Sequence, residues 1–324
     1  MKDKPDAFTN WKGKDNLQIF FPKTFYMRYR QLGSSPLQIS EIGFGCMSLI
    51  EGDPDNIRLL NHALELGINF FDTADLYQKG NNEIILGKAF RRKRKEVIIA
   101  SKVGNQWRPD GSGWDWNPRK EYILAAIDKS LRRLQTDYID LYQLHGGTIE
   151  DPVDETIEAF ELLQKLGKIR YYGISSIRPN VIRSYAERSN IISVMMQYSL
   201  LDRRPEETCF SLLQNKKIAI LARGTIAQGL LTGKTPKPYL NYTEIEVKAA
   251  AEGIASLTDK RRSRAQTAIH FVLQQDVISS AVVGMKNMEQ LKEAVQTIST
   301  ELLEKNEIEF LQNLLRANYY KEHR

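Results

Sequence analysis

The chain has 324 residues, of which 42% are apolar and 27% charged, and its net charge is +6 with a pI near 9.1. This composition is typical of an ordinary soluble globular protein. No apolar run approaches the ~18 residues of a membrane helix, the N-terminus has no signal-peptide core, and Cys46 and Cys209 are too few for a disulfide framework. We therefore expect a cytoplasmic protein without a membrane partner.

The first 26 residues are polar and lack periodicity, so we interpret them as a flexible N-terminal extension, with Met27 as an alternative start of the protein. Residues 27–33 and 37–40 are able to pair as a short hairpin. No linker or low-complexity region divides the remainder, so we expect one domain over residues 27–324.

After residue 40, strand-like apolar runs alternate with helical patterns. The expected strands cover residues 42–46, 69–72, 97–102, 139–145, 171–175, 194–197, 219–223 and 280–283. Eight strand–helix units predict an α/β fold, a (β/α)8 TIM barrel, with the short hairpin before it and helices after it. The alternative is a doubly wound open sheet, which usually has fewer strands.

Helix starts and ends are marked by polar and glycine residues. Asp53, Asn117 and Asp151 each precede a proline, a pairing that predicts an N-cap followed by proline at the first helical position. Gly67 and Gly167 stand where a helix needs a left-handed cap.

The densest charge is the basic run at residues 91–95, which lies between a helical pattern and a strand. That position lies on the barrel rim opposite to the carboxyl ends of the strands. We interpret the run as a solvated helix end, where cations are favourable. No aromatic residues interleave with it, as they would in a single-strand binder, so no nucleic acid partner is expected.

Four polar residues stand at or just after the ends of expected strands: Asp72, Tyr77, Lys102 and His145. Such ends converge on one rim of a parallel barrel, where these barrels carry out chemistry. A phenol has a pKa of about 10, and a nearby ammonium lowers it. The pattern therefore predicts Tyr77 as a proton donor, with Lys102 lowering its pKa, Asp72 holding Lys102, and His145 orienting the substrate or relaying a proton.

Several motifs in this order resemble those of the aldo/keto reductases, and most closely bacterial ones. They are DTADLY (72–77), SK (101–102), DYIDLYQLH (137–145), GTIED (147–151), GISS (173–176), SIRPN (176–180), QYSLLDR (197–203) and GLLTGK (229–234). The resemblance runs from about Arg28 to the last helices.

The resemblance implies NADPH bound across the carboxyl-terminal rim, an aldehyde or ketone as substrate, and a monomer. It also implies the residues that contact the cofactor: Gly45, Cys46, Met47, Asp72, Ser175, Ser176, Gln197, Arg223, Gly224, Gly284, Lys286, Asn287, Gln290 and Glu293. Lys286 and Asn287 would face the 2′-phosphate, which favours NADPH over NADH. No metal is implied.

Three positions depart from the family's pattern. Ser176 replaces an asparagine, Ala294 replaces another near the adenine, and Arg223 replaces the aromatic residue that stacks on the nicotinamide. A guanidinium plane is able to stack on a ring, but stacking a cation on the oxidised, cationic nicotinamide is unfavourable. We therefore expect weaker binding of the oxidised cofactor than of NADPH.

Three further features of the sequence also have to be interpreted. Residues 43–48 (GFGCMS) lack the third glycine of a dinucleotide fingerprint, and we interpret Cys46 as packing, because no sequence context stabilises a thiolate. Trp107, in the loop after the third strand, either pins that loop or lines the substrate pocket; we assign it to the pocket.

Two alternative functions are compatible with the same barrel fold. One is an NADP(H)-binding regulatory or redox-sensing protein with slow turnover, against which the intact Tyr77 and Lys102 argue. The other is an aldolase that uses Lys102 as a Schiff-base amine, which would require a neutral lysine.

Overall fold

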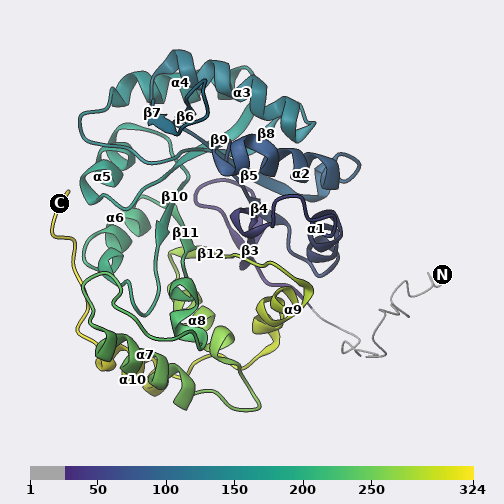
Figure 1. The fold of residues 1–324 in the computed structure, drawn as a ribbon. Helices are drawn as coiled ribbons and strands as arrows, with labels where there is room; N and C mark the ends of the chain where they lie inside the picture. Colours follow the sequence, from purple (N-terminus) through teal and green to yellow (C-terminus); the bar gives the residue numbers. More distant parts are fainter. Residues whose placement is uncertain (1–25) are drawn as a thin grey trace.

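The computed structural model describes residues 26–324, and its centre is a closed barrel of eight parallel strands surrounded by helices (Figure 1). The strands follow one another around the barrel in chain order: β3 (Ile42–Gly45), β4 (Phe70–Asp72), β5 (Ile98–Val103), β8 (Ile139–Leu144), β9 (Ile169–Ser175), β10 (Ser193–Gln197), β11 (Ala219–Arg223) and β12 (Ile278–Val283). The predicted (β/α)8 barrel is confirmed. Residues 1–25 of the expected extension lie outside the described part of the chain.

The helices cover the outside of the barrel and bury apolar side chains between them and the strands (Figure 1). They are α1 (Asn56–Glu65), α2 (Asn81–Phe90), α3 (Lys120–Leu134), α4 (Val153–Lys165), α5 (Pro179–Arg188), α6 (Cys209–Asn215), α7 (Glu244–Ser256), α8 (Arg264–Leu273), α9 (Met288–Gln296) and α10 (Lys305–Leu314). In the described residues, no helix is long and apolar enough to cross a membrane.

The expected N-terminal hairpin is present and closes the amino-terminal end of the barrel. Strands β1 (Tyr29–Gln31) and β2 (Gln38–Ser40) pair antiparallel. Fully buried Leu32 and Ile39 join the apolar cluster inside the barrel, which includes Phe70 of β4 and Leu141 of β8. The hairpin therefore supplies apolar surface that fills the barrel interior.

The predicted N-caps are wrong at the three proline sites. Helix α1 begins at Asn56 and α3 at Lys120, two residues after their prolines, and Pro152 itself is the residue before α4. Asp53 and Asn117 instead accept the N–H two residues ahead, at 2.8 and 3.1 Å. The side chains thus form local turns that precede the helices, because these residues bond their own backbone readily.

The basic run lies where it was expected, between the end of α2 and the start of β5. Arg91 and Arg92 are exposed. Arg94 differs from the prediction, because it donates to Asp140 at 2.6 Å and to the carbonyl oxygen of Tyr138 at 2.9 Å. One member of the run is therefore an anchor between neighbouring strands rather than a solvated cation.

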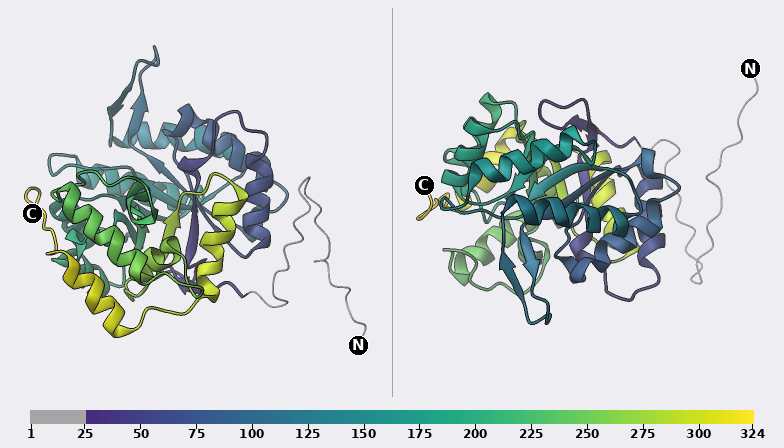
Figure 2. Two further views of the ribbon diagram at one scale, coloured as in Figure 1. Left: turned by 60° about the horizontal axis from the view of Figure 1, so that its bottom comes forward. Right: turned by 90° about the horizontal axis from the view of Figure 1, so that it is seen from above.

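A second hairpin, which the sequence did not predict, projects from the barrel after β5 (Figure 2). Strands β6 (Asn105–Trp107) and β7 (Trp114–Trp116) pair antiparallel. Trp116 Nε1 donates to Asp151 at 2.9 Å, and the Asn117 N–H donates to the Gly104 carbonyl at 2.7 Å. The base of the hairpin is thus fixed to the carboxyl-terminal rim.

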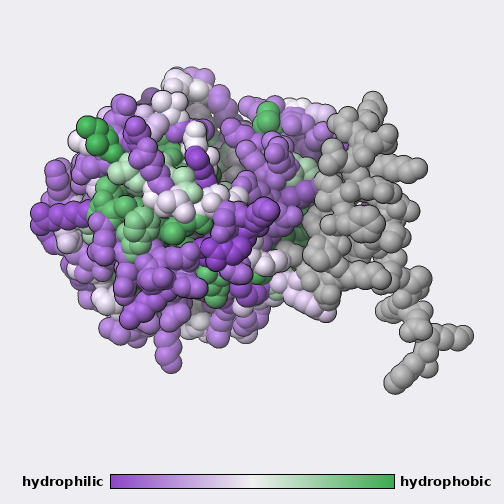
Figure 3. All heavy atoms as spheres, turned by 90° about the horizontal axis from the view of Figure 1, so that it is seen from below, coloured by the Kyte–Doolittle hydropathy of each residue, from purple (hydrophilic) through white to green (hydrophobic). Residues whose placement is uncertain are grey.

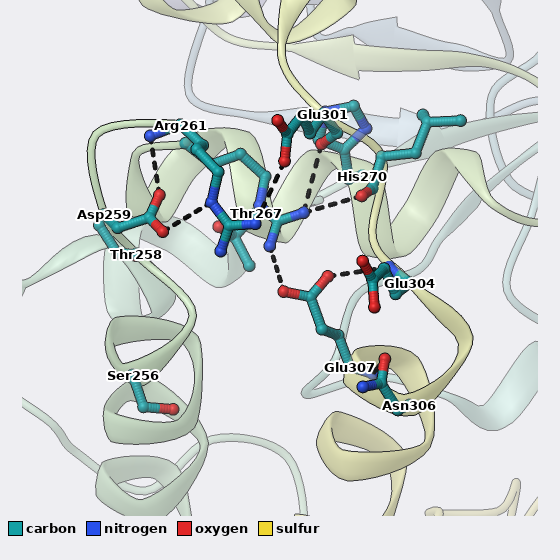
Figure 4. Close-up of polar contacts among 12 residues, drawn as sticks. Ser256, Thr258, Asp259, Arg261, Thr267, His270, Glu301, Glu304, Asn306 and Glu307 are labelled. Atoms are coloured by element: carbon teal, nitrogen blue, oxygen red, sulfur yellow. Dashed lines mark hydrogen bonds and ion pairs between the residues drawn. The ribbon is translucent and has the colours of Figure 1, made fainter.

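The segment leading into α10 is held by a buried cation. The Arg262 side chain is 1% exposed; it donates to the carbonyl oxygen of Leu302 at 2.8 Å and pairs with Glu307. Figure 4 shows Glu301, Glu304 and Glu307 of this segment beside the loop that carries Asp259 and Arg261. This contact fixes the C-terminal helix to the barrel.

The face that carries α7 and α10 bears a patch of hydrophobic side chains surrounded by hydrophilic ones (Figure 3). The exposed large apolar residues of these helices include Ile245, which is 81% exposed, and Phe310, which is 42% exposed. The expectation of a monomer stays a prediction.

Candidate active site

The four polar residues singled out from the sequence meet at the carboxyl-terminal rim. Asp72 ends β4, Lys102 lies near the end of β5, and His145 directly follows β8. These three strands are neighbours in the barrel. Tyr77 opens the short turn Tyr77–Gly80 that leads from β4 to α2.

Lys102 is the centre of this group. Its side chain is 1% exposed, and Nζ donates to Asp72 Oδ2 at 2.7 Å, to the Thr73 carbonyl at 2.8 Å and to Tyr77 Oη at 3.3 Å. An ammonium group has three protons, so each proton has one acceptor. This arrangement fixes Nζ beside the tyrosine hydroxyl.

Burial and the neighbouring charges together set the protonation state of Lys102. Although burial lowers the pKa of Lys102, Asp72 and Tyr77 together raise it above its ordinary value. Lys102 therefore stays an ammonium group, held by the Asp72 carboxylate. A charged lysine with three acceptors does not fit the Schiff-base alternative, which requires a free neutral amine.

The pKa of Tyr77 differs from the expectation. Burial raises the pKa of its hydroxyl above the ordinary value, and Lys102 only opposes this rise. Desolvation penalises the phenolate more than the single cation favours it. Tyr77 is therefore protonated at neutral pH, as a proton donor must be.

His145 is neutral throughout the physiological range. Burial, with Lys102 and Arg223 adding to it, lowers its pKa to about 3. Its ring stands edge-on to the Tyr77 ring at a centroid distance of 5.8 Å. Its Nδ1 atom is buried and has no hydrogen-bond partner within residues 26–324. A neutral imidazole in this place is suited to hydrogen bonding with a substrate oxygen.

Two polar groups of the site were missed in the sequence. Gln143 of β8 donates from Nε2 to Asp72 Oδ1 at 3.4 Å, and the Thr73 carbonyl accepts from Lys102. Alternation could have identified Gln143, because residues i and i+2 of a strand share a face and His145 lies two residues on. The Thr73 carbonyl carries no signal in the sequence.

A buried acidic cluster behind the site was also missed. Burial and the neighbouring Glu83 raise the pKa of Asp75 to about 8. Glu83 pairs with Arg133 at 2.6 Å and accepts from Ser101 at 2.5 Å. The cluster joins the segment before Tyr77 to α2, α3 and the residue before Lys102.

Several of the residues expected to contact the cofactor also lie on this rim. Gly45, Ser175, Gln197 and Arg223 are the last residues of β3, β9, β10 and β11. Cys46, Met47, Ser176 and Gly224 directly follow these strands. Cys46 is fully buried, and burial raises the pKa of its thiol, in agreement with a packing role.

The residues expected at the adenosine end follow β12. Gly284, Lys286 and Asn287 are exposed. Asn287 caps α9 by accepting the Gln290 N–H at 2.9 Å, and Gln290 Oε1 accepts the Lys286 N–H at 2.9 Å. Glu293 accepts from Ser263 at 2.6 Å. These contacts order the loop locally and leave the Lys286 side chain at the surface.

Comparisons with known proteins identify the family of the chain. A family model described as the aldo/keto reductase family matches residues 41–316. The chain belongs to the aldo/keto reductase family. The uncharacterized oxidoreductase YqkF of Bacillus subtilis (strain 168) is 48% identical over 307 residues, or 92% of this chain and 100% of that protein. The aldo-keto reductase yakc [NADP(+)] of Schizosaccharomyces pombe is 34% identical over 219 residues, or 64% of each chain.

Solved structures of one aldo-keto reductase, AKR11C1 from Bacillus halodurans, are also similar. The holo form has a TM-score of 0.87 at 49% identity, and the apo form a TM-score of 0.79 at 46% identity. Each comparison covers 92% of this chain and 99% of the other. The expected family and fold are thereby confirmed, and the protein is an oxidoreductase of this family.

In this aldo/keto reductase, Arg223 stands at the position expected to carry an aromatic residue. Its Nη1 donates to Gln197 Oε1 at 3.1 Å, and Gln197 Nε2 donates to Tyr239 at 2.8 Å. The guanidinium is thus anchored on one side, and its charge lowers the pKa of His145. Arg223 therefore adds a second cation to the site, besides Lys102.

Trp107 lies beside the candidate catalytic tyrosine of this aldo/keto reductase. Its Nε1 donates to the carbonyl oxygen of Leu76 at 3.2 Å, and the Lys79 ammonium lies 5.1 Å from the centre of its ring. These contacts place Trp107 next to the Tyr77 turn, and its assignment to the substrate pocket stays a prediction. Among residues 26–324, no group of three or more acidic, histidine or cysteine side chains could hold a metal ion.

Proposed function

We propose that this aldo/keto reductase is an NADPH-dependent carbonyl reductase that converts an aldehyde or ketone to an alcohol, as a cytoplasmic monomer. The observation that carries the proposal is the contact of Lys102 Nζ with both Asp72 and Tyr77, at 2.7 and 3.3 Å. It places a fixed cation beside a protonated phenol at the rim where barrel enzymes carry out chemistry.

The rim has groups that fit a nicotinamide cofactor. Gln143 Oε1 and His145 Nδ1 are buried polar atoms without a hydrogen-bond partner in the described residues. Buried polar atoms normally have partners, so a bound molecule would complete the site. Ser175, Ser176 and Gln197 would hold the carboxamide, and Arg223 would lie against the nicotinamide ring.

NADPH is preferred to NADH in this proposal. Lys286 and Asn287 lie at the amino end of α9, where an anionic phosphate is favoured. The name of the Schizosaccharomyces pombe relative includes NADP(+). Bound NADPH supplies the hydride for the reaction.

Residues of the chain donate the proton and orient the substrate. Tyr77 gives its hydroxyl proton to the substrate oxygen, which becomes the hydroxyl of the product. Lys102 stabilises the phenolate that is left, because its Nζ already contacts Tyr77 Oη. Asp72 keeps Lys102 charged and in place. Neutral His145 forms a hydrogen bond with the substrate oxygen and so orients the carbonyl group.

Replacing one hydroxyl tests this proposal. In Tyr77→Phe, oxidation of NADPH with an activated aromatic aldehyde should fall about 10²–10⁴-fold, the usual contribution of a general acid. NADPH binding, followed by its fluorescence, should persist. Tyr138→Phe is the matched control, because the Tyr138 ring lies between Arg94 and Arg170 at the amino ends of the strands. Turnover retained in Tyr77→Phe would refute the assigned acid. Tight binding of NADPH without turnover in the wild type would favour the regulatory alternative.

A further inference from the structure

The turn after Tyr77 has an unusual backbone. Gln78 and Lys79 have φ values of 49° and 53°, and Gly80 follows with φ 88°. Three consecutive left-handed residues are rare, and two of these carry a Cβ atom, which makes the conformation unfavourable. Contacts from the surrounding structure must therefore hold the turn in place.

Each residue of this turn contacts a different segment of the chain. Gln78 Nε2 donates to the carbonyl oxygen of Leu49, in the loop after β3, at 2.8 Å. Gly80 lies against the Arg133 side chain of α3, where a Cβ atom would be 2.7 Å away. The Lys79 ammonium reaches the β6–β7 hairpin, over the Trp107 ring and 3.4 Å from the Gly111 carbonyl.

The same hairpin is hydrogen-bonded to the backbone beside both groups expected to touch the substrate oxygen. Trp107 Nε1 donates to the carbonyl of Leu76, the residue before Tyr77. Asn105 Nδ2 donates to the carbonyl of His145 at 3.1 Å. The hairpin tip otherwise projects from the barrel (Figure 2). Beyond the contacts that fix its base to the rim, Lys79 contacts the hairpin at two points, the Trp107 ring and the Gly111 carbonyl.

From these contacts we propose that Lys79 is a positioning residue, which fixes Trp107 as a wall of the substrate pocket and so favours carbonyl compounds with a planar aromatic group. This proposal rests on the proposed reductase function. Lys79 lies over one face of the indole, so a substrate ring contacts the other face or the edge. A wall that is already fixed loses little conformational freedom when the substrate binds.

The test compares an aromatic aldehyde, 4-nitrobenzaldehyde, with a small aliphatic one, propanal. Loss of the cation in Lys79→Met should raise KM for 4-nitrobenzaldehyde roughly 2- to 5-fold, the range of an exposed cation–π contact. The kcat for both aldehydes and the KM for propanal should stay unchanged, because the hydrogen bonds from Trp107 to Leu76 and from Asn105 to His145 do not involve Lys79. Lys79→Arg should restore the wild-type KM, because a guanidinium also binds an aromatic face.

A second variant separates the contact with Trp107 from the backbone of the turn. Asparagine tolerates the left-handed conformation but is too short to reach the indole. Lys79→Asn should therefore reproduce the change seen in Lys79→Met. In a Trp107→Leu background, Lys79→Met should have no further effect on KM. A fall in kcat for both aldehydes, or an effect of Lys79→Met that Lys79→Asn lacks, would overturn the proposal, since the turn and not Trp107 would then be responsible.

Hydrogen exchange tests the contact between Lys79 and the β6–β7 hairpin without a measurement of enzyme activity. Amide exchange over residues 105–116 should become faster in Lys79→Met and Lys79→Asn than in the wild type or Lys79→Arg. Unchanged exchange in both variants would overturn the proposal. A wild type that reduces neither aldehyde would refute the proposed function, and the exchange rates would then still decide whether Lys79 fixes the hairpin.

Discussion

Replacing Lys102 with methionine separates the stability of the site from its chemistry. Methionine has a similar length, so the space of the buried side chain stays largely filled. The Asp72 side chain, which is only 6% exposed, loses its ion pair and keeps a 3.4 Å contact with Gln143. Breaking a buried pair in this way destabilises proteins by about 3–5 kcal/mol. We therefore expect Lys102→Met to lower the free energy of unfolding by an amount in this range.

The pH dependence of this loss has a definite sign. Burial raises the pKa of Asp72 and Lys102 opposes this rise, so loss of Lys102 raises this pKa further and the folded state binds more protons than the unfolded state. Stability then falls as the pH rises through the folded pKa. Relative to the wild type, Lys102→Met should thus lose more stability at pH 8 than at pH 5. Adding Asp72→Asn removes the buried charge and should recover most of the loss.

Urea unfolding followed by circular dichroism measures these stabilities, and NADPH oxidation measures the activity. Both the single and the double variant should lose about 10²–10⁴-fold in turnover, because neither has the cation beside Tyr77. A Lys102→Met protein as stable as the wild type at pH 8 would refute the buried ion pair. Recovery of turnover in the double variant would refute the role of Lys102.

Three further predictions concern other parts of the structure. The pKa of His145 is about 3 in the folded protein against 6.5 for the free side chain, so the unfolded chain binds the extra proton and stability falls as the pH drops from 6.5 towards 3. In His145→Gln, the urea midpoint should therefore fall less over this pH range than in the wild type. The same fall in both proteins would contradict the prediction. Arg223→Tyr should strengthen binding of NADP⁺ relative to NADPH in fluorescence titrations, and an unchanged ratio would contradict the stacking argument. Gly87→Ala places a Cβ 2.4 Å from the Arg133 carbonyl and should destabilise the packing of α2 on α3 by about 1–3 kcal/mol. Gly253→Ala is the control, because the nearest neighbour of its Cβ is the movable end of the Leu314 side chain. Equal urea midpoints for the two variants would contradict the close packing at Gly87.

Much of the barrel could be predicted because its strands and helices are local patterns. Apolar runs such as residues 97–102 and the helical spacing of residues 122–134 depend only on neighbours in the chain. The motif at residues 72–77 likewise placed two candidate catalytic residues. The β6–β7 hairpin was missed because its strands have only three residues each, too few to show a strand pattern, and they lie among glycines and polar residues. Its strands form because the base of the hairpin is fixed to the rim.

The sequence by itself determined the order of strands and helices, the family, and the side chains that arrive at the carboxyl-terminal rim. It did not determine how these side chains are solvated. Burial makes Tyr77 a weaker acid than the nearby lysine alone would, and keeps His145 neutral. Nor could it show that Lys79 reaches Trp107 or that Asn105 reaches the His145 carbonyl. Only the tertiary structure decided these features, because desolvation and contacts between distant segments depend on how the whole barrel packs.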